Sequence, residues 1–222
     1  MADRRARWGD RAWRAVNVLV LLMVGWILFR PGGLIGRPIS AWNARRQTAA
    51  LLRNNWSALV GGKRRLDSGG AVVEVVEFSD YQCPYCRMQE AALSSFLRGE
   101  PRTGVVYRHF PLSSHPAARG AALAAICAEE QRRFRAMHVR LLETSSWLSD
   151  TNWIREAEAV GIPDTARFRS CLNGPSSLSV LDADIAMGRL LSVTGTPTFV
   201  TRKGLFPGVH TEAELLRLVA PE

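Results

Sequence analysis

The Cys-Pro-Tyr-Cys motif at residues 83–86 constrains this chain more than any other feature, because of the segments on either side of it. Residues 71–78 are mostly β-branched or apolar, which is typical of a buried strand. Residues 87–97 carry apolar side chains at helical spacing and predict a helix. Cys83 therefore lies at a helix start, where free backbone N–H groups and the helix dipole favour a thiolate. Thiol–disulfide exchange requires such an arrangement.

The positive charge of the chain is concentrated near its N-terminus. Of a formal net charge of +9, most belongs to residues 1–46, which hold nine arginines against two aspartates. The remainder is almost neutral. A nucleic-acid-binding domain needs a basic face on the domain itself, so the sequence disfavours that class of function.

An apolar run follows the first arginines. Residues 15–29 are apolar apart from Asn17, which is short of the roughly 20 residues that a membrane span needs. Snorkelling arginines and an extension to residue 37 supply the missing length. Because no clear cleavage motif follows, we expect a cytoplasmic basic tail and a single uncleaved transmembrane signal anchor at residues 1–37. A cleaved signal peptide and a core helix of a soluble protein are the alternatives.

The rest of the chain predicts an α/β domain. Residues 38–70 are expected to be a tether with a lead-in helix, and residues 71–222 the domain itself. A second strand at 104–110 completes a β-α-β unit, which implies a partly parallel sheet. Helical patterns occupy residues 113–192, with Ser113 or Ser114 as the expected first cap. Further elements are expected at 198–201 (strand), 205–209 (strand) and 211–219 (a helix opened by a capping box).

Three features together carry a family resemblance. Residues 77–87 (EFSDYQCPYCR), the helical stretch and the Thr-Pro-Thr-Phe segment at residues 196–199 resemble the DsbA-like branch of the thioredoxin-fold thiol–disulfide oxidoreductases. The similarity runs over about residues 47–220. It implies a thioredoxin fold with an inserted helical domain. It also implies an enzyme whose redox group is its own cysteine pair, without a bound cofactor or metal.

The resemblance assigns roles residue by residue. Cys83 would be the attacking, solvent-facing thiolate and Cys86 the buried resolving partner. Pro197 looks like the cis-proline of the family and would expose the backbone of Thr196 to an extended substrate. Glu77 is placed where the family often carries a buried acid, which would accept the proton of Cys86.

Cys127 and Cys171 remain. Cysteines of a C-x-x-C motif normally pair with each other, which leaves these two for a structural disulfide, as in some DsbA-like relatives. Such a bridge requires an oxidising compartment. The alternative is a pair of buried free thiols, since free cysteine packs as a small hydrophobe.

Other polar residues receive plainer interpretations. We expect Glu90 to support Glu77, His109 and His138 to be packed side chains, and His115 to be a cap or loop residue. A zinc site is disfavoured, because the sequence has no second C-x-x-C motif and none of its four histidines lies at ligand spacing from another cysteine. Four arginines are interpreted as a solvated helix face, with a patch for an acidic partner as the alternative: Arg132, Arg133, Arg135 and Arg140.

These observations predict a monomeric thiol–disulfide oxidoreductase that is anchored in the bacterial inner membrane with its catalytic domain outside the cytoplasm. Its Cys83–Cys86 disulfide would oxidise cysteines of exported proteins or peptides, and a membrane redox partner would reoxidise it. A disulfide isomerase or reductase of the same fold and a non-catalytic peptide-binding module are the alternatives.

Overall fold

The computed structural model describes residues 2–30, 36–61, 64–67 and 70–220 of the chain. The chain divides into two compact units, Met1–Ala50 and Leu51–Glu222. Helix α1 (Ala2–Phe29) lies in the first unit, and helix α2 (Gly36–Val60) begins in the first unit and ends in the second.

The transmembrane anchor expected at residues 1–37 is not found among the described residues of this segment. Among the described residues, none of the helices combines the length and the apolar character needed to cross a membrane. Residues 1 and 31–35 of the expected anchor lie outside the described residues.

A four-stranded mixed sheet forms the centre of the second unit, in the order β2-β1-β3-β4. The first two strands are parallel, and the other neighbours are antiparallel. The parallel pair is joined by α3 (Pro84–Gly99), as a parallel connection requires a crossover. The strands are β1 (Val72–Ser79), β2 (Thr103–His109), β3 (Thr198–Thr201) and β4 (Gly204–Pro207).

Alternation of side chains along β1 gives the sheet two apolar faces. Val75 belongs to the cluster that contains Leu93 and Phe96 of α3 and Leu215 of α10 (Glu212–Val219). On the other face, Val76 and Phe78 pack in a second cluster with three residues of α2 that lie in the same unit, Leu52, Trp56 and Leu59. The capping box predicted at the start of α10 is confirmed, with Thr211 and Glu214 bonded reciprocally.

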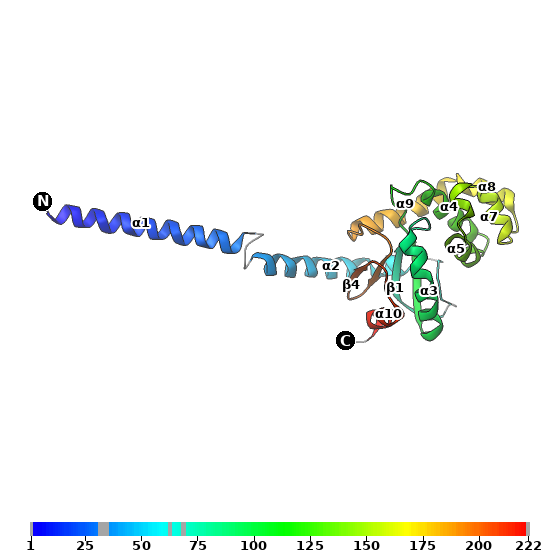
Figure 1. Ribbon diagram of the computed structural model, residues 1–222, viewed down its shortest axis with the longest axis horizontal. Helices are drawn as coiled ribbons and strands as arrows, with labels where there is room; N and C mark the ends of the chain where they lie inside the picture. Colours follow the sequence, from blue (N-terminus) through cyan, green and yellow to red (C-terminus); the bar gives the residue numbers. More distant parts are fainter. Residues whose placement is uncertain (1, 31–35, 62–63, 68–69, 221–222) are drawn as a thin grey trace. The chain divides into compact units, whose positions relative to one another are not determined.

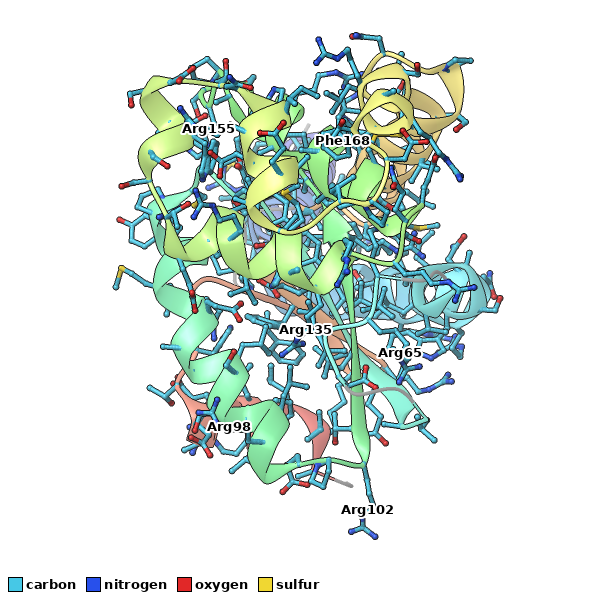
Figure 2. All side chains as sticks on the ribbon, turned by 90° about the vertical axis from the view of Figure 1, so that its right-hand side faces the viewer. Arg65, Arg98, Arg102, Arg135, Arg155 and Phe168 are labelled. Carbon is cyan, nitrogen blue, oxygen red and sulfur yellow. A yellow bond between two sulfur atoms is a disulfide. The ribbon has the colours of Figure 1, made fainter. Side chains whose placement is uncertain are left out.

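Helices α4 to α9 form a block between β2 and β3. Figure 1 shows α4, α5, α7 and α8 gathered together, while α3 and α10 lie beside the sheet. In Figure 2 Phe168 of α8 lies among these helices, where it is fully buried, whereas Arg98 and Arg155 project from the surface. The helices are α4 (Ala118–Glu129), α5 (Phe134–Glu143), α6 (Ser146–Ser149), α7 (Trp153–Ala159), α8 (Thr165–Leu172) and α9 (Pro175–Leu190).

A buried carboxylate ties this block to the sheet. Asp184 of α9 is fully buried and accepts hydrogen bonds from Arg64 at 2.8 and 2.9 Å and from Arg108 of β2 at 2.8 Å. Arg108 also donates to the carbonyls of Ala58 and Leu59 at the end of α2. A buried charge is tolerated only when it is paired and hydrogen-bonded, and these contacts satisfy Asp184 while joining three elements.

A disulfide joins Cys127 of α4 to Cys171 of α8, with an S–S distance of 2.05 Å and a separation of 44 residues. Cys127 is fully buried in the main core cluster. The bridge therefore links the first helix of the block to a helix that lies much later in the chain.

We expect replacement of both Cys127 and Cys171 by alanine to lower the free energy of unfolding by roughly 4 kcal/mol, because the unfolded chain regains the entropy of an open 44-residue loop. Urea denaturation monitored by circular dichroism measures the change. The wild type and the double variant are both kept with Cys83 and Cys86 as free thiols. Mass spectrometry of the wild type without further reduction verifies the Cys127–Cys171 disulfide. An unchanged unfolding free energy would contradict this account.

Candidate active site

The C-P-Y-C motif lies at the junction of β1 and α3. Cys83 is the N-cap residue of α3 in an extended conformation, with φ −67° and ψ 123°. Pro84 follows at the first helical position, where its missing N–H costs nothing. Cys86 is then in the first helical turn, and both cysteines are free thiols in this structure. The chain therefore begins its helix with one sulfur at the open end and the other one turn inside.

The expected solvent-facing position of Cys83 is wrong for this structure. Its residue is only 3% exposed, little more than the 1% of Cys86. The physical reason is its contact with the loop before β3, where the carbonyl oxygen of Thr196 lies 3.3 Å from Cys83 Sγ. A substrate thiol must therefore approach along this loop.

The Thr196–Pro197 peptide bond is cis and lies opposite the cysteines. Strand register explains this placement. β3 runs antiparallel to β1, and Thr198 pairs with Phe78 near the end of β1, so the start of β3 and the end of β1 share one edge of the sheet. The structure thus brings Thr196 and Pro197 together with a cysteine that lies 113 positions earlier.

The two sulfurs differ strongly in acidity. The pKa of Cys83 is lowered to about 5, chiefly by a hydrogen bond from the Cys86 thiol. Burial opposes this shift. The side chain of Thr196 and the backbone N–H groups of Cys86 and Tyr85 lower the pKa further. Burial raises the pKa of Cys86 far above its usual range, and the neighbouring Cys83 and the charge of Glu77 raise it further. At neutral pH Cys83 is therefore a thiolate beside a Cys86 thiol.

Glu77 lies beneath this pair in the middle of the sheet. It is 3% exposed, and its register partners are Tyr107 of β2 and Phe199 of β3. Burial raises the pKa of Glu77 to about 8, and the negative charge of Glu90 adds to the shift. Its Oε2 atom has no hydrogen-bond partner. A carboxyl group with this pKa can exchange a proton with Cys86 near neutral pH.

Glu90 acts on Glu77 through its charge and is itself held by histidine. His138 Nε2 lies 3.3 Å from Glu90 Oε2, and His138 Nδ1 lies 3.2 Å from the hydroxyl of Tyr81. Burial raises the pKa of Glu90, but the hydrogen bond and charge of His138, the hydrogen bond from Ser94 and the charge of Arg135 together outweigh burial and lower it. His138 is buried as expected, but it also contributes a polar contact that sequence patterns did not indicate.

His109 is packed against the rings of Tyr81 and Tyr107 and is 1% exposed. Burial lowers its pKa well below the usual value, and the nearby charges of Arg64, His138 and Arg108 lower it further. His109 is thus a neutral packed side chain. Within the described part of the chain, no group of three or more histidine, cysteine or acidic residues is arranged to hold a metal ion.

Sequence reasoning missed Asp80 and underrated His115. Asp80 is buried between the end of β1 and the cysteines, and its amide N–H donates to Cys86 Sγ at 3.4 Å. His115 Nδ1 lies 2.7 Å from Asp80 Oδ2. The only signal in the sequence was the position of Asp80 three residues before Cys83, since nothing marks a contact between residues 35 apart.

A family model described as a DSBA-like thioredoxin domain matches residues 74–220. A thioredoxin-like oxidoreductase from Silicibacter pomeroyi is 30% identical, with coverage of 73% of this chain and 94% of that chain and a TM-score of 0.66. Two more distant structures share the fold. The catalytic domain of Proteus mirabilis ScsC is 22% identical, with coverage of 77% of this chain and 96% of that chain and a TM-score of 0.67. The thiol-disulfide exchange protein alpha-DsbA2 from Wolbachia pipientis is 18% identical, with coverage of 79% and 95% and a TM-score of 0.68.

Curated relatives include larger proteins. The Na(+)/H(+) antiporter NhaA 3 of Salinispora tropica is 39% identical over 130 residues, which are 58% of this chain and 20% of the antiporter. A second antiporter, NhaA 1 of Salinispora arenicola, is 38% identical over the same shares. The chain thus matches about a fifth of the length of these curated relatives.

We expect Glu77→Gln to stabilise the oxidised protein increasingly as the pH rises from 4.5 to 8. A carboxyl group whose folded pKa is raised favours folding below its unfolded pKa of about 4.5, and this contribution is lost as the pH approaches 8. The difference should grow by at most roughly 1.4 kcal/mol per pH unit and should vanish near pH 4.

Urea denaturation across this pH range measures the difference. Glu158→Gln on the exposed side of α7 is the matched control and should show no such trend. A gain from Glu77→Gln that is the same at pH 4 and pH 8 would contradict the raised pKa of Glu77.

Proposed function

The chain belongs to the family of DSBA-like thioredoxin domains, and from this premise we propose that it works as an oxidant of protein thiols outside the cytoplasm. It is a thiol–disulfide oxidoreductase whose redox group is a cysteine pair. The direction of electron transfer, the compartment and the partners are the substance of the proposal.

One observation supports the oxidising direction above all others, namely the pKa of about 5 of Cys83. A thiolate that is stable at neutral pH stabilises the reduced enzyme relative to its disulfide. The disulfide therefore tends to accept electrons from a substrate dithiol. Low thiol pKa also makes Cys83 the better leaving group when a substrate disulfide is released.

The reaction takes two exchange steps. A substrate thiolate attacks Cys83 Sγ, the Cys83–Cys86 bond breaks, and its electron pair passes to Cys86, which takes up a proton. The second substrate thiolate then attacks the substrate sulfur of the mixed disulfide, and Cys83 leaves as a thiolate. The substrate gains a disulfide and the enzyme gains two electrons. Glu77, with a pKa of about 8, is the proposed donor of the proton that Cys86 takes up.

The loop before β3 is the proposed substrate platform. The carbonyl of Thr196 faces Cys83, and Pro197 contributes no N–H that would compete with a substrate backbone. An extended peptide can pair with this exposed backbone as an added strand while its cysteine reaches Cys83. Protein or peptide substrates follow from this mode of binding, because backbone pairing is independent of side-chain identity.

The compartment is inferred from two features. The Cys127–Cys171 disulfide requires an oxidising environment, which in bacteria lies outside the cytoplasm. The N-terminal arginines followed by the apolar residues 15–29 are typical of a segment that attaches to the inner membrane with its basic end in the cytoplasm. A membrane redox partner that accepts electrons from the reduced Cys83–Cys86 pair completes the proposed cycle.

The oxidised protein is expected to restore activity to a reduced, unfolded ribonuclease at stoichiometric amounts. Cys83→Ser should lower the rate by at least about 100-fold, because no other described sulfur lies at the helix start. Replacing Cys127 and Cys171 together is the matched control and should retain the rate below the unfolding temperature. Efficient insulin reduction combined with failure in this refolding assay would make the protein a reductase and contradict the proposal.

Fusion of alkaline phosphatase after residue 222 tests the compartment, because this enzyme is active only where its own disulfides form. The full chain should give an active fusion in the membrane fraction of a bacterial cell. A fusion that starts at residue 47 should be inactive and soluble. An inactive full-length fusion would contradict the extracytoplasmic location.

A further inference from the structure

We infer that His115 is a positioning residue that acts through Asp80 to hold the hydrogen bond between the Asp80 amide and Cys86 Sγ. The inference rests on the proposed exchange at Cys83 and Cys86. It adds a role for two residues, Asp80 from the loop before α3 and His115 from the loop before α4, to which the family resemblance assigned none.

Asp80 contacts both cysteines through its backbone. Its amide N–H donates to Cys86 Sγ at 3.4 Å, and its carbonyl oxygen accepts from the Cys83 N–H at 3.0 Å. The orientation of Asp80 therefore determines whether its N–H points at Cys86 Sγ. A hydrogen bond to a charged group contributes about twice as much free energy as one between neutral groups. The Asp80 N–H therefore stabilises Cys86 most when its sulfur carries negative charge.

Three donors fix the side chain of Asp80, which is fully buried. Oδ1 accepts from the N–H of Gln82 at 2.8 Å, and Oδ2 accepts from the N–H of Leu112 at 2.9 Å. The third contact is His115 Nδ1 at 2.7 Å from Oδ2. A buried carboxylate needs its hydrogen bonds, and without His115 the Oδ2 atom keeps only the Leu112 N–H, so the side chain of Asp80 is held less firmly.

His115 is the only side chain among these three donors, since the other two are backbone N–H groups. Its side chain is 20% exposed and lines a surface groove to which Thr194, in the loop that carries Thr196, also contributes. We call these three hydrogen bonds to the Asp80 carboxylate the Asp80 clamp. His115 is the part of the clamp that a substitution can remove without changing the backbone.

The exchange mechanism gives this clamp a specific task. When a thiolate attacks Cys83, the breaking bond leaves its electron pair on Cys86, whose thiolate is otherwise strongly disfavoured by burial. The Asp80 N–H is a donor already aimed at this developing charge. Loss of the clamp should therefore slow the departure of Cys86 while leaving Cys83 as a nucleophile unaffected.

Two reactions separate these effects. Reduction of the Cys83–Cys86 disulfide by dithiothreitol requires Cys86 to leave and needs no substrate groove. Alkylation of the reduced Cys83 by iodoacetamide does not involve Cys86 as a leaving group, and its pH profile should have a midpoint near 5. A wild type whose disulfide resists dithiothreitol altogether would overturn the proposed function, whereas the comparison of variants tests the present inference alone.

His115→Leu removes the donor at similar volume and should lower the rate constant with dithiothreitol about tenfold, the effect of one charge-assisted hydrogen bond. His115→Asn places an amide nitrogen near the Nδ1 position and should restore the rate to within about threefold of wild type. His115→Gln extends its amide past that position and should behave as a second loss variant.

Gln131→Ala is the matched control. It removes two hydrogen bonds to the backbone of Asp164 in the helical block, away from the cysteines, and should leave both reactions unchanged. In all variants the alkylation midpoint of Cys83 should stay near 5. A wild-type rate in His115→Leu and His115→Gln, no recovery in His115→Asn, or a raised Cys83 midpoint together with the slower rate would each overturn the inference.

Discussion

The hydrogen bond from the buried Cys86 thiol to the sulfur of Cys83 is the interaction on which the site depends. It is the largest contribution to the low pKa of Cys83, and Cys86 can donate only because burial keeps it protonated. One sulfur is therefore ready to act as nucleophile or leaving group, and the other retains a proton. We expected Cys83 to be exposed and Cys86 to be buried, but both are almost fully buried. The difference in pKa between the two sulfurs therefore does not require a difference in exposure.

The sheet supplies the geometry for that interaction. Because β1 ends at the cysteines and β3 begins beside it, the edge of the sheet brings α3, the Thr196–Pro197 loop and the buried Glu77 to one place. Alternation along β1 points Glu77 toward α3, while Val76 and Phe78 pack on the opposite face. The same strand thus carries core residues on one face and the proposed proton donor Glu77 on the other, and a one-residue shift in register would exchange the two faces.

The part of this site that could be predicted from sequence is the part that depends on local chemistry. A C-x-x-C pair after an apolar strand, a Thr-Pro segment before another strand and an acid six residues before Cys83 all follow from short motifs. The contact of Asp80 with His115 could not be predicted, because it joins two loops through a bond that no motif or periodicity encodes. The resemblance placed the Thr196–Pro197 loop at the cysteines, but the burial of Cys83 beneath it was not expected, because no motif gives the exposure of a side chain.

Capping of α4 shows the same limit. Serines at 113 and 114 were reasonable caps, yet α4 begins at Ala118, its N-cap residue Ala117 has no side-chain cap, and the Ala117 N–H donates to Gln82 Oε1 at 2.8 Å. A side chain from the active-site loop thus replaces a local cap. Local propensity is overridden here by a tertiary contact that ties the helical block to the cysteines.

The reduction potential of the Cys83–Cys86 pair tests the central claim most directly. Equilibration of the protein with glutathione redox buffers at pH 7, followed by alkylation and mass analysis, gives this potential. If the low pKa of Cys83 stabilises the reduced form, the potential should lie at about −180 mV or above, toward that of strong protein oxidants near −120 mV. A potential below about −250 mV, close to that of thioredoxin, would contradict the account.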